Sequence, residues 1–392
     1  MNADELFDRA RQRRAEGDVD GAIADYTEVI ALEPDEVAAY INRSHLHFGR
    51  EAWDATIADL SEAIRLEPES ADLRHDRALA RLRKGDHGGA RLDLEACLKI
   101  DPNHAAALNN RGTLKEENGD HAGAIIDYSQ ALTSDPDFKD ALANRADAYH
   151  KSGDLRRALE DYSQLLSIDP KNADALNDRG VVRHELHDLN RAIADYEAAM
   201  ELNPGDPTPW FNRGNVREEL GDFPEALADY SRAIEIDRAY GDAYVNRGNL
   251  HRASGDFDSA LADYETALEL NPLDDLALFN RAIMRGEWGD PGGAMIDYTE
   301  AIRLNPQYGE AYTNRGSQRM DMGDAKGALA DWSEAVRINA ADVIARKNRA
   351  EARLEFGDRE GAIEDYEKCL ESAPREWEFR AEIEHALRKL KR

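Results

Sequence analysis

The sequence predicts an all-α solenoid, in which short helix pairs stack on one another along the chain. A Gly-Asp dipeptide recurs at spacings of 34 or 68 residues from Gly17 to Gly357, which defines eleven units of 34 residues without insertion or deletion. Small, aromatic and apolar residues recur in each unit at helical spacing, and a proline follows them at a constant position. Such a period indicates a repeat array. The repeat array is therefore preferred to the two or three globular domains that a length of 392 residues alone would suggest.

The first half of each unit is predicted to form a helix, here called helix A. We number the positions of a unit from 1 to 34, with the glycine of the dipeptide at position 15. Helix A is expected over positions 2 to 14, because the glycine can adopt the left-handed conformation that ends a helix. The aspartate at position 16 is a favourable N-cap for the next helix. Two units lack the glycine and have Glu51 or His187 in its place.

The second half is predicted to form helix B over positions 18 to 30. Alanine or threonine at position 20, an aromatic residue at position 24 in nine units, and a small residue at position 27 lie on one stripe. A proline at position 32 ends the helix in nine units. Position 8 of helix A is glycine, alanine or serine, and we expect this small residue to let helix A approach the alanine of position 20 closely.

The eleven units are expected to form one continuous solenoid over residues 3–376, followed by a capping helix and basic tail over residues 377–392. Trp377, Phe379, Ile383, Leu387 and Leu390 recur at roughly helical spacing, so this segment should cover the last repeat.

This pattern resembles the tetratricopeptide repeat (TPR) family over essentially the whole chain. The resemblance includes the period, the small residues at positions 8 and 27, the alanine at position 20, the aromatic residue at position 24 and the proline at position 32. It implies a right-handed superhelix with helix A on the concave face, where positions 2, 5, 6, 9, 12 and 13 line a groove. It also implies a protein or peptide partner. One departure is position 7, which is leucine in the family and arginine here in every unit.

The composition excludes several classes of function. The chain has 50 basic and 80 acidic residues, and a net charge of −30 repels phosphate backbones, so no nucleic-acid partner is expected. The mean hydropathy of −0.71 and the lack of a long apolar run predict no membrane association. A start without an apolar leader favours the cytoplasm. Cys97 and Cys369 both occupy position 27, as small core residues. No motif for a catalytic residue, metal or cofactor is found, so a non-enzymatic protein is predicted.

Arginine at position 7 and aspartate at position 23 occur in all eleven units, and we predict that they form a structural ion-pair ladder. Both positions border the packed stripes of their helices, and a partly buried charge must be paired. The planar guanidinium matches a carboxylate bidentately. The pairs could form within a unit or between adjacent units. Four of them are Arg111 with Asp127, Arg179 with Asp195, Arg213 with Asp229, and Arg247 with Asp263.

Asparagine at position 6 forms a row along the predicted groove. An amide offers donors and an acceptor, so one amide per repeat could bind the backbone of an extended peptide. The row looks like the asparagine ladder in the superhelical groove of O-linked N-acetylglucosamine transferase. The alternative is that these amides bond helix to helix and only stiffen the array. The row comprises Asn42, Asn110, Asn144, Asn212, Asn246, Asn280, Asn314 and Asn348, and Asn215 and Asn249 at position 9 widen it.

Acidic residues at positions 2 and 13 add negative charge to the predicted groove. They serve solubility, or they steer a neutral to basic segment into the groove. The preferred function is therefore a scaffold that binds an extended peptide or protein segment. One alternative is a self-associating structural module, with a homo-oligomer built on the edges of the array or on exposed apolar residues such as Phe211, Phe279 and Trp288. Another is a targeting arm for an enzyme on a separate chain.

Overall fold

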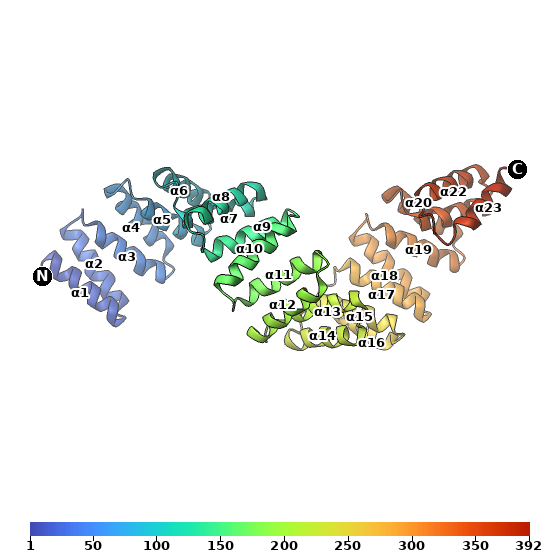
Figure 1. Cartoon of the computed structure of the whole chain (residues 1–392), viewed down its shortest axis with the longest axis horizontal. Helices are drawn as coiled ribbons and strands as arrows, with labels where there is room; N and C mark the ends of the chain where they lie inside the picture. The colour runs from blue at the N-terminus through green and yellow to red at the C-terminus, as the bar shows by residue number, and fades with distance from the viewer. The chain divides into compact units, whose positions relative to one another are not determined.

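The computed structural model describes residues 1–392 and contains 23 α-helices (Figure 1). The odd-numbered helices from α1 to α21 are the A helices: α1 (Ala3–Glu16), α3 (Val37–Gly49), α5 (Ala71–Lys84), α7 (Ala105–Glu117), α9 (Lys139–Lys151), α11 (Ala173–Glu185), α13 (Thr208–Leu220), α15 (Gly241–Ala253), α17 (Asp275–Trp288), α19 (Gly309–Asp321) and α21 (Val343–Glu355). The even-numbered helices are the B helices: α2 (Val19–Leu32), α4 (Trp53–Leu66), α6 (His87–Ile100), α8 (His121–Ser134), α10 (Leu155–Ile168), α12 (Leu189–Leu202), α14 (Phe223–Ile236), α16 (Phe257–Leu270), α18 (Pro291–Leu304), α20 (Ala325–Ile338) and α22 (Arg359–Ser372). The last helix is α23 (Arg380–Leu390). The predicted all-α repeat solenoid is confirmed.

The turn between helices A and B follows the chemistry of positions 15 and 16. Nine glycines at position 15 have φ between 77° and 89°, in the left-handed region. In the two units without glycine, Glu51 and His187 adopt the same region, with φ of 59° and 58°, and a side chain there is strained. The aspartate at position 16 caps most B helices, as Asp18 does by accepting a hydrogen bond from the Gly21 amide over 3.0 Å.

The small residue at position 8 makes room for the aromatic ring at position 24. The expected close approach to position 20 is seen in repeat 2, where Oγ1 of Thr56 donates to the carbonyl of Ser44 at position 8 over 3.5 Å. A Cβ atom added to Gly112 would lie 2.5 Å from the ring of Tyr128 at position 24. Gly180 and Tyr196 show the same distance. In these repeats the aromatic ring of helix B therefore packs against helix A at a glycine, which has no side chain.

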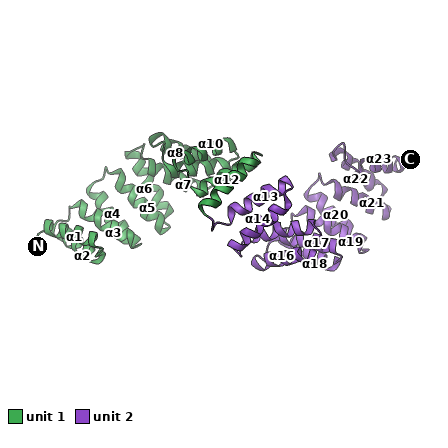
Figure 2. Cartoon of the chain, turned by 60° about the horizontal axis from the view of Figure 1, so that its bottom comes forward, with its two compact units in different colours: residues 1–203 green, residues 204–392 purple.

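The chain divides into two compact units, Met1–Asn203 with helices α1–α12 and Pro204–Arg392 with helices α13–α23 (Figure 2). Each A helix packs against the B helix of its own repeat, and within a unit each B helix packs against the next A helix. Consecutive A helices also contact one another, as α7 does with α9 and α17 with α19. Continuity of the solenoid across the junction at residues 203–204 stays a prediction.

Helix α23 packs on the last repeat. Ile383 and Leu387 are buried in a cluster with Tyr366 and Cys369 of α22. The helix begins at Arg380, three residues after the expected start, and Trp377 and Phe379 lie in the preceding turn with their rings edge to face. Position 27 of the repeats is thus a core position, and both cysteines are buried there.

None of the 23 helices combines the length and the apolar composition that crossing a membrane would require.

Candidate functional site

The position-7 arginine forms a bidentate ion pair with the position-23 aspartate of its own repeat in all eleven repeats. In repeat 8, Nε of Arg247 donates to Asp263 Oδ2 over 2.9 Å and Nη2 donates to Oδ1 over 2.7 Å. The same two-bond geometry recurs in Arg9–Asp25, Arg43–Asp59, Arg77–Asp93, Arg111–Asp127, Arg145–Asp161, Arg179–Asp195, Arg213–Asp229, Arg281–Asp297, Arg315–Asp331 and Arg349–Asp365. Every one of these aspartates is buried. Of the two arrangements left open above, the structure has the one within a repeat.

A second cation supports the aspartate in most repeats. An arginine or lysine at position 11 contacts it in eight of them, as Arg285 does with Asp297 over 2.8 Å. In repeat 5 position 11 is Tyr149, so Asp161 has Arg145 alone. In repeat 1 the hydrogen bonds from Arg9 hold the pKa of Asp25 below its ordinary value. In repeats 2 and 8 position 11 is a histidine, 3.9 Å from the aspartate. The ladder is therefore a buried charge network in which three aspartates lack a second arginine or lysine, and Asp161 has no second basic group at all.

The same arginine also reaches the preceding repeat. Its Nη1 donates to a hydroxyl at position 25 of the previous B helix in five repeats, for example from Arg145 to Ser129 over 3.1 Å. Position 25 is serine, threonine or glutamate in all eleven repeats, which are all hydrogen-bond acceptors. The acceptors at position 25 can be read from the sequence, but their bonds to the arginines of the next repeat were not predicted. The ladder links each of these five repeats to the one before it.

The asparagine row lies half-buried on the layer of A helices, and several of its amides join neighbouring helices. Nδ2 of Asn144 donates to Asn109 of the preceding A helix over 3.0 Å, and Nδ2 of Asn246 donates to Asn215 over 2.9 Å. Asn110 contacts His75 over 3.0 Å, and Asn348 donates to Ser317 over 3.4 Å. Nδ2 of Asn42 donates to the carbonyl of Ala38 in its own helix, and Oδ1 of Asn42 accepts from Arg14 of the preceding A helix over 3.2 Å. Asn212 lies in α13, Asn280 in α17 and Asn314 in α19.

Tyrosine hydroxyls from the B helices reach the same face and bond position 9. Tyr230 donates to Asn215 Oδ1 over 2.8 Å, and Tyr264 donates to Asn249 Oδ1 over 2.7 Å. Burial raises the pKa of Tyr264 to about 12, so its hydroxyl stays a donor. The carbonyl oxygen of Asn215 thus accepts two hydrogen bonds, from Tyr230 and Asn246, whereas that of Asn249 accepts one and keeps a free lone pair.

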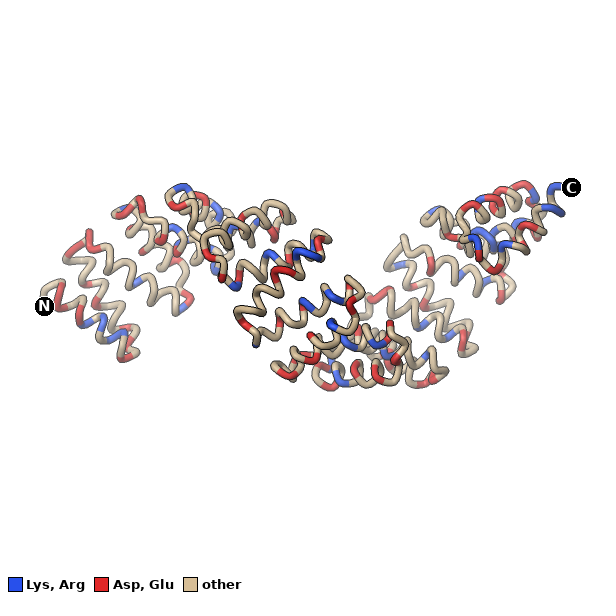
Figure 3. Tube along the Cα trace, viewed as in Figure 1, with Lys and Arg blue, Asp and Glu red and all other residues tan.

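The acidic character of the A-helix face has a measurable consequence in repeat 6. Asp178 stands at position 6, where most repeats have asparagine. Burial and the nearby charge of Asp147 raise the pKa of Asp178 to about 6. Close by, Nε2 of His150 lies 2.7 Å from Glu185 Oε1. Acidic residues occur throughout both units (Figure 3).

The A-helix face is also hollowed beside two residues of the asparagine row. In the first unit a space of about 250 Å³ is lined by Leu79, Leu82 and Asn110, among others. In the second unit a space of about 420 Å³ is lined by Asn314, with Phe279 and other side chains. Phe279 is buried, so the expectation that it is an exposed apolar residue is wrong, whereas Trp288 is exposed. Each hollow thus combines an amide with apolar walls, an arrangement typical of sites for side chains of a bound peptide.

The fold and this face define a class of protein, a stacked array of helix hairpins with a polar, hollowed A-helix layer. Sequence profiles of the tetratricopeptide repeat match residues 7–72, 75–137, 145–208, 205–272, 245–309 and 313–376. The chain therefore belongs to the tetratricopeptide repeat family, as its repeat pattern predicted. In general terms, it is a protein-interaction scaffold.

A solved structure agrees with this assignment of the fold. Yeast Tom70 is 16% identical, with a TM-score of 0.52, over 99% of this chain and 95% of that one. A tetratricopeptide repeat protein from Parabacteroides merdae is also similar, with 21% identity and a TM-score of 0.49, over 65% of this chain and 99% of that one. A search of curated protein sequences returned no match.

Proposed function

We propose that the protein binds an extended segment of a partner protein along its A-helix face, and that it has no catalytic activity of its own. The observation that carries this proposal is the row of half-buried amides on successive A helices, with hollows beside Asn110 and Asn314. A backbone that lies along such a row meets an amide in each repeat that has asparagine at position 6, which is the case in eight of the eleven repeats. Apolar side chains of the segment would then enter the hollows.

The two readings of the asparagine row are compatible in chemical terms. An asparagine side chain has two N–H donors and a carbonyl oxygen with two lone pairs. The bond from Asn246 to Asn215 uses one of these donors. The remaining groups of Asn246 can hydrogen-bond a peptide while the first bond orients the amide. Interhelical bonds would then preorganise the row for a ligand, which lowers the entropic cost of binding.

The charge of the chain indicates the chemistry of the partner. A net charge of −30 and acidic side chains on the A-helix face favour a neutral to basic segment. Electrostatic steering of this kind raises the association rate and weakens with salt. We therefore expect the partner segment to dissociate more readily as the salt concentration rises.

The test uses two asparagine variants that differ in structural role. Asn280 makes no hydrogen bond within the chain, so Asn280→Ala removes a groove amide without breaking a contact. Asn246→Ala also removes the bond to Asn215. Partners would be captured by crosslinking and affinity purification, with thermal melting measured in parallel. Asn190→Ala, an exposed asparagine on a B helix, is the matched control.

The proposal expects Asn280→Ala, combined with Asn246→Ala, to lose the captured partner while Asn190→Ala keeps it. Unchanged capture by the double variant, with a lowered melting temperature, would show that the row only stiffens the array. Mass measured by size exclusion at several concentrations tests the alternative of a self-associating module. A screen for turnover on the purified chain tests the absence of activity, and partner capture tests the alternative of a targeting arm.

A further inference from the structure

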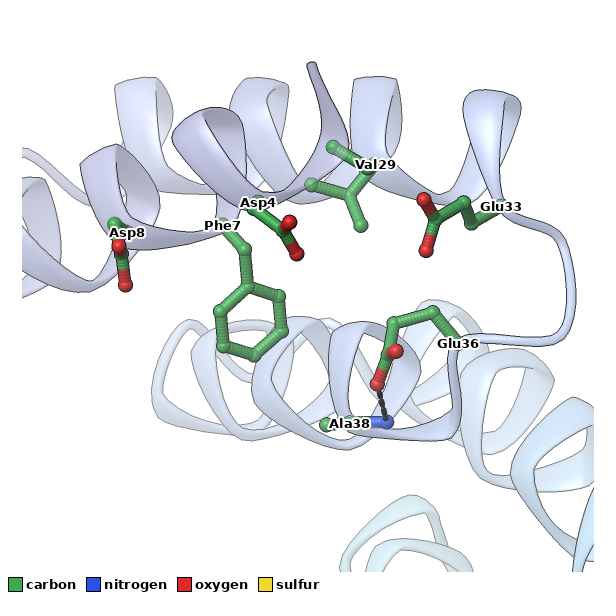
Figure 4. A pocket seen from close by; sticks show the side chains of 8 residues that line it. Asp4, Phe7, Asp8, Val29, Glu33, Glu36 and Ala38 are labelled. Atoms are coloured by element: carbon green, nitrogen blue, oxygen red, sulfur yellow. Dashed lines mark hydrogen bonds between the residues drawn. The ribbon is translucent and has the colours of Figure 1, made fainter.

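The A-helix face of repeat 1 contains a hollow of about 400 Å³, here called the N-terminal hollow (Figure 4). Asp4, Phe7 and Asp8 extend from α1, and Val29 and Glu33 come from α2 and its C-cap. Glu36 and Ala38 at the start of α3 complete the lining. In Figure 4 the carboxylates of Asp4, Glu33 and Glu36 face the space beside Phe7 and Val29. The hollow therefore has apolar walls and an acidic rim.

The rim has no internal counter-charge. No lysine, arginine or histidine lines the hollow. Of its four carboxylates only Glu36 makes a hydrogen bond, which it accepts from the Ala38 amide over 3.2 Å. Some acidic residues elsewhere on the A-helix face do have a cationic partner, as Glu287 has Arg252 at 2.8 Å. The rim of the N-terminal hollow is thus a group of like charges that lacks the partner found at other sites.

Two further features favour a cation in the hollow. Glu33 is the C-cap of α2, where the helix dipole disfavours a negative charge. The ring of Phe7 is held edge to face against buried Tyr26, with the ring centroids 5.4 Å apart, so it stays beside the carboxylates. An aromatic ring attracts a cation, and an apolar wall accommodates the methylene stem of a long basic side chain.

We propose that the N-terminal hollow binds an arginine or lysine side chain of the partner segment, a statement that rests on the proposed function. The stem of the basic residue would pack on Phe7 and Val29, and its charged end would donate hydrogen bonds to the carboxylates of the rim. A guanidinium or ammonium group supplies several donors for such a rim. Asp8 occupies position 6 in repeat 1, so the hollow continues the asparagine row with a charged member.

An equivalent hollow in repeat 10 provides an internal comparison. Its lining includes the same four positions, 2, 6, 31 and 34, which are Glu310, Asn314, Asn339 and Asp342. Two carboxylates are replaced by amides there, and Asp342 already accepts hydrogen bonds from Ala345 and Thr313. Repeat 1 is the only repeat with an acidic residue at all four positions. Selectivity for a basic side chain should therefore be strongest in repeat 1.

The test is a titration of the full chain with the short peptide acetyl-Gly-Arg-Gly-amide, followed by nuclear magnetic resonance. The amide signal of Ala38 reports on the hollow, because Ala38 bonds a rim carboxylate. We expect a saturable shift of this signal with the arginine peptide. Peptides with norleucine or glutamate in place of arginine should give none. The variant Asp8→Asn with Glu33→Gln should weaken the binding at least tenfold.

A control variant, Glu69→Gln with Glu160→Gln, makes the same change in net charge at two exposed residues of the first unit. It should bind the arginine peptide as the parent chain does. Equal shifts with all three peptides, no saturable shift, or full binding by the Asp8→Asn/Glu33→Gln variant would overturn the inference. Loss of partner capture in the asparagine variants is a separate result. The two failures are therefore distinguishable: absent peptide binding with intact partner capture would overturn the hollow alone, and lost support for partner capture would leave only the measured binding of an arginine side chain.

Discussion

Replacing Arg145 by leucine should unfold repeat 5 more readily than the equivalent change unfolds any repeat with a second cation. Arg145 gives Asp161 two charge-assisted hydrogen bonds of 2.7 and 2.8 Å, and no other cation contacts this buried carboxylate. Removing one member of a buried ion pair costs about 3–5 kcal/mol, because the remaining charge has no partner. We expect Arg145→Leu to lower the free energy of unfolding of this repeat by that amount.

Arg281→Leu in repeat 9 is the matched comparison. Asp297 keeps a contact of 2.8 Å with Arg285 after the substitution, so its charge stays paired. The loss is then that of the hydrogen bonds from Arg281 to a charged group, roughly 1.5–3 kcal/mol. The double variant Arg145→Leu with Asp161→Leu should recover most of the stability, since an apolar pair can replace a buried ion pair at little cost.

Local measurements suit a repeat array, because its parts need not unfold together. Hydrogen exchange followed by mass spectrometry gives the opening free energy of α9 and α10 for Arg145→Leu, and of α17 and α18 for Arg281→Leu. Equal losses in the two repeats would refute the reasoning about the second cation. A loss below about 1 kcal/mol for Arg145→Leu would refute the structural weight given to the pair itself.

Three more predictions follow from the local structure. The pKa of Asp178 is raised to about 6, so the folded state binds its proton more tightly than the unfolded state, and stability falls as pH rises from about 4 to 6. Asp178→Asn should then raise the free energy of unfolding at pH 7 by roughly 1–3 kcal/mol, which thermal melting would detect as a higher melting temperature. At pH 4 the melting temperature should be nearly unchanged. The backbone of Glu51 is held in the left-handed region at φ 59°, so Glu51→Gly should add about 1 kcal/mol of stability in urea denaturation, and an unchanged midpoint would contradict strain at this turn. Gly112→Val should cost roughly 1–3 kcal/mol in the same assay, because its side chain would collide with Tyr128, and an unchanged midpoint would contradict that packing.

The period and the turn chemistry carried enough information to predict the helices. Helix A was expected over positions 2 to 14, and α1 covers positions 1 to 14 of repeat 1. Helix B was expected over positions 18 to 30, and α2 covers positions 17 to 30. Glycine and aspartate at the turn act through the local backbone, so they can be read from one repeat alone.

The side-chain contacts between helices could not be predicted in the same way. Spacing places the arginine of position 7 and the aspartate of position 23 on packed stripes, but the direction of each side chain decides which aspartate an arginine reaches. The contact between Gly112 and Tyr128 depends on the same directions, so the approach of the position-24 ring to position 8 was not predicted. The N-terminal hollow was not predicted because its residues are up to 35 positions apart and meet only when three helices pack.

The bonds at position 25 give five junctions between consecutive repeats the same polar contact. Each arginine of the ladder pairs with the aspartate of its own repeat. In five repeats it also donates a hydrogen bond to the hydroxyl at position 25 of the preceding repeat. A repeat that carries both groups can thus follow any other that carries them. Gene duplication could lengthen or shorten such an array by whole repeats without creating a new kind of junction.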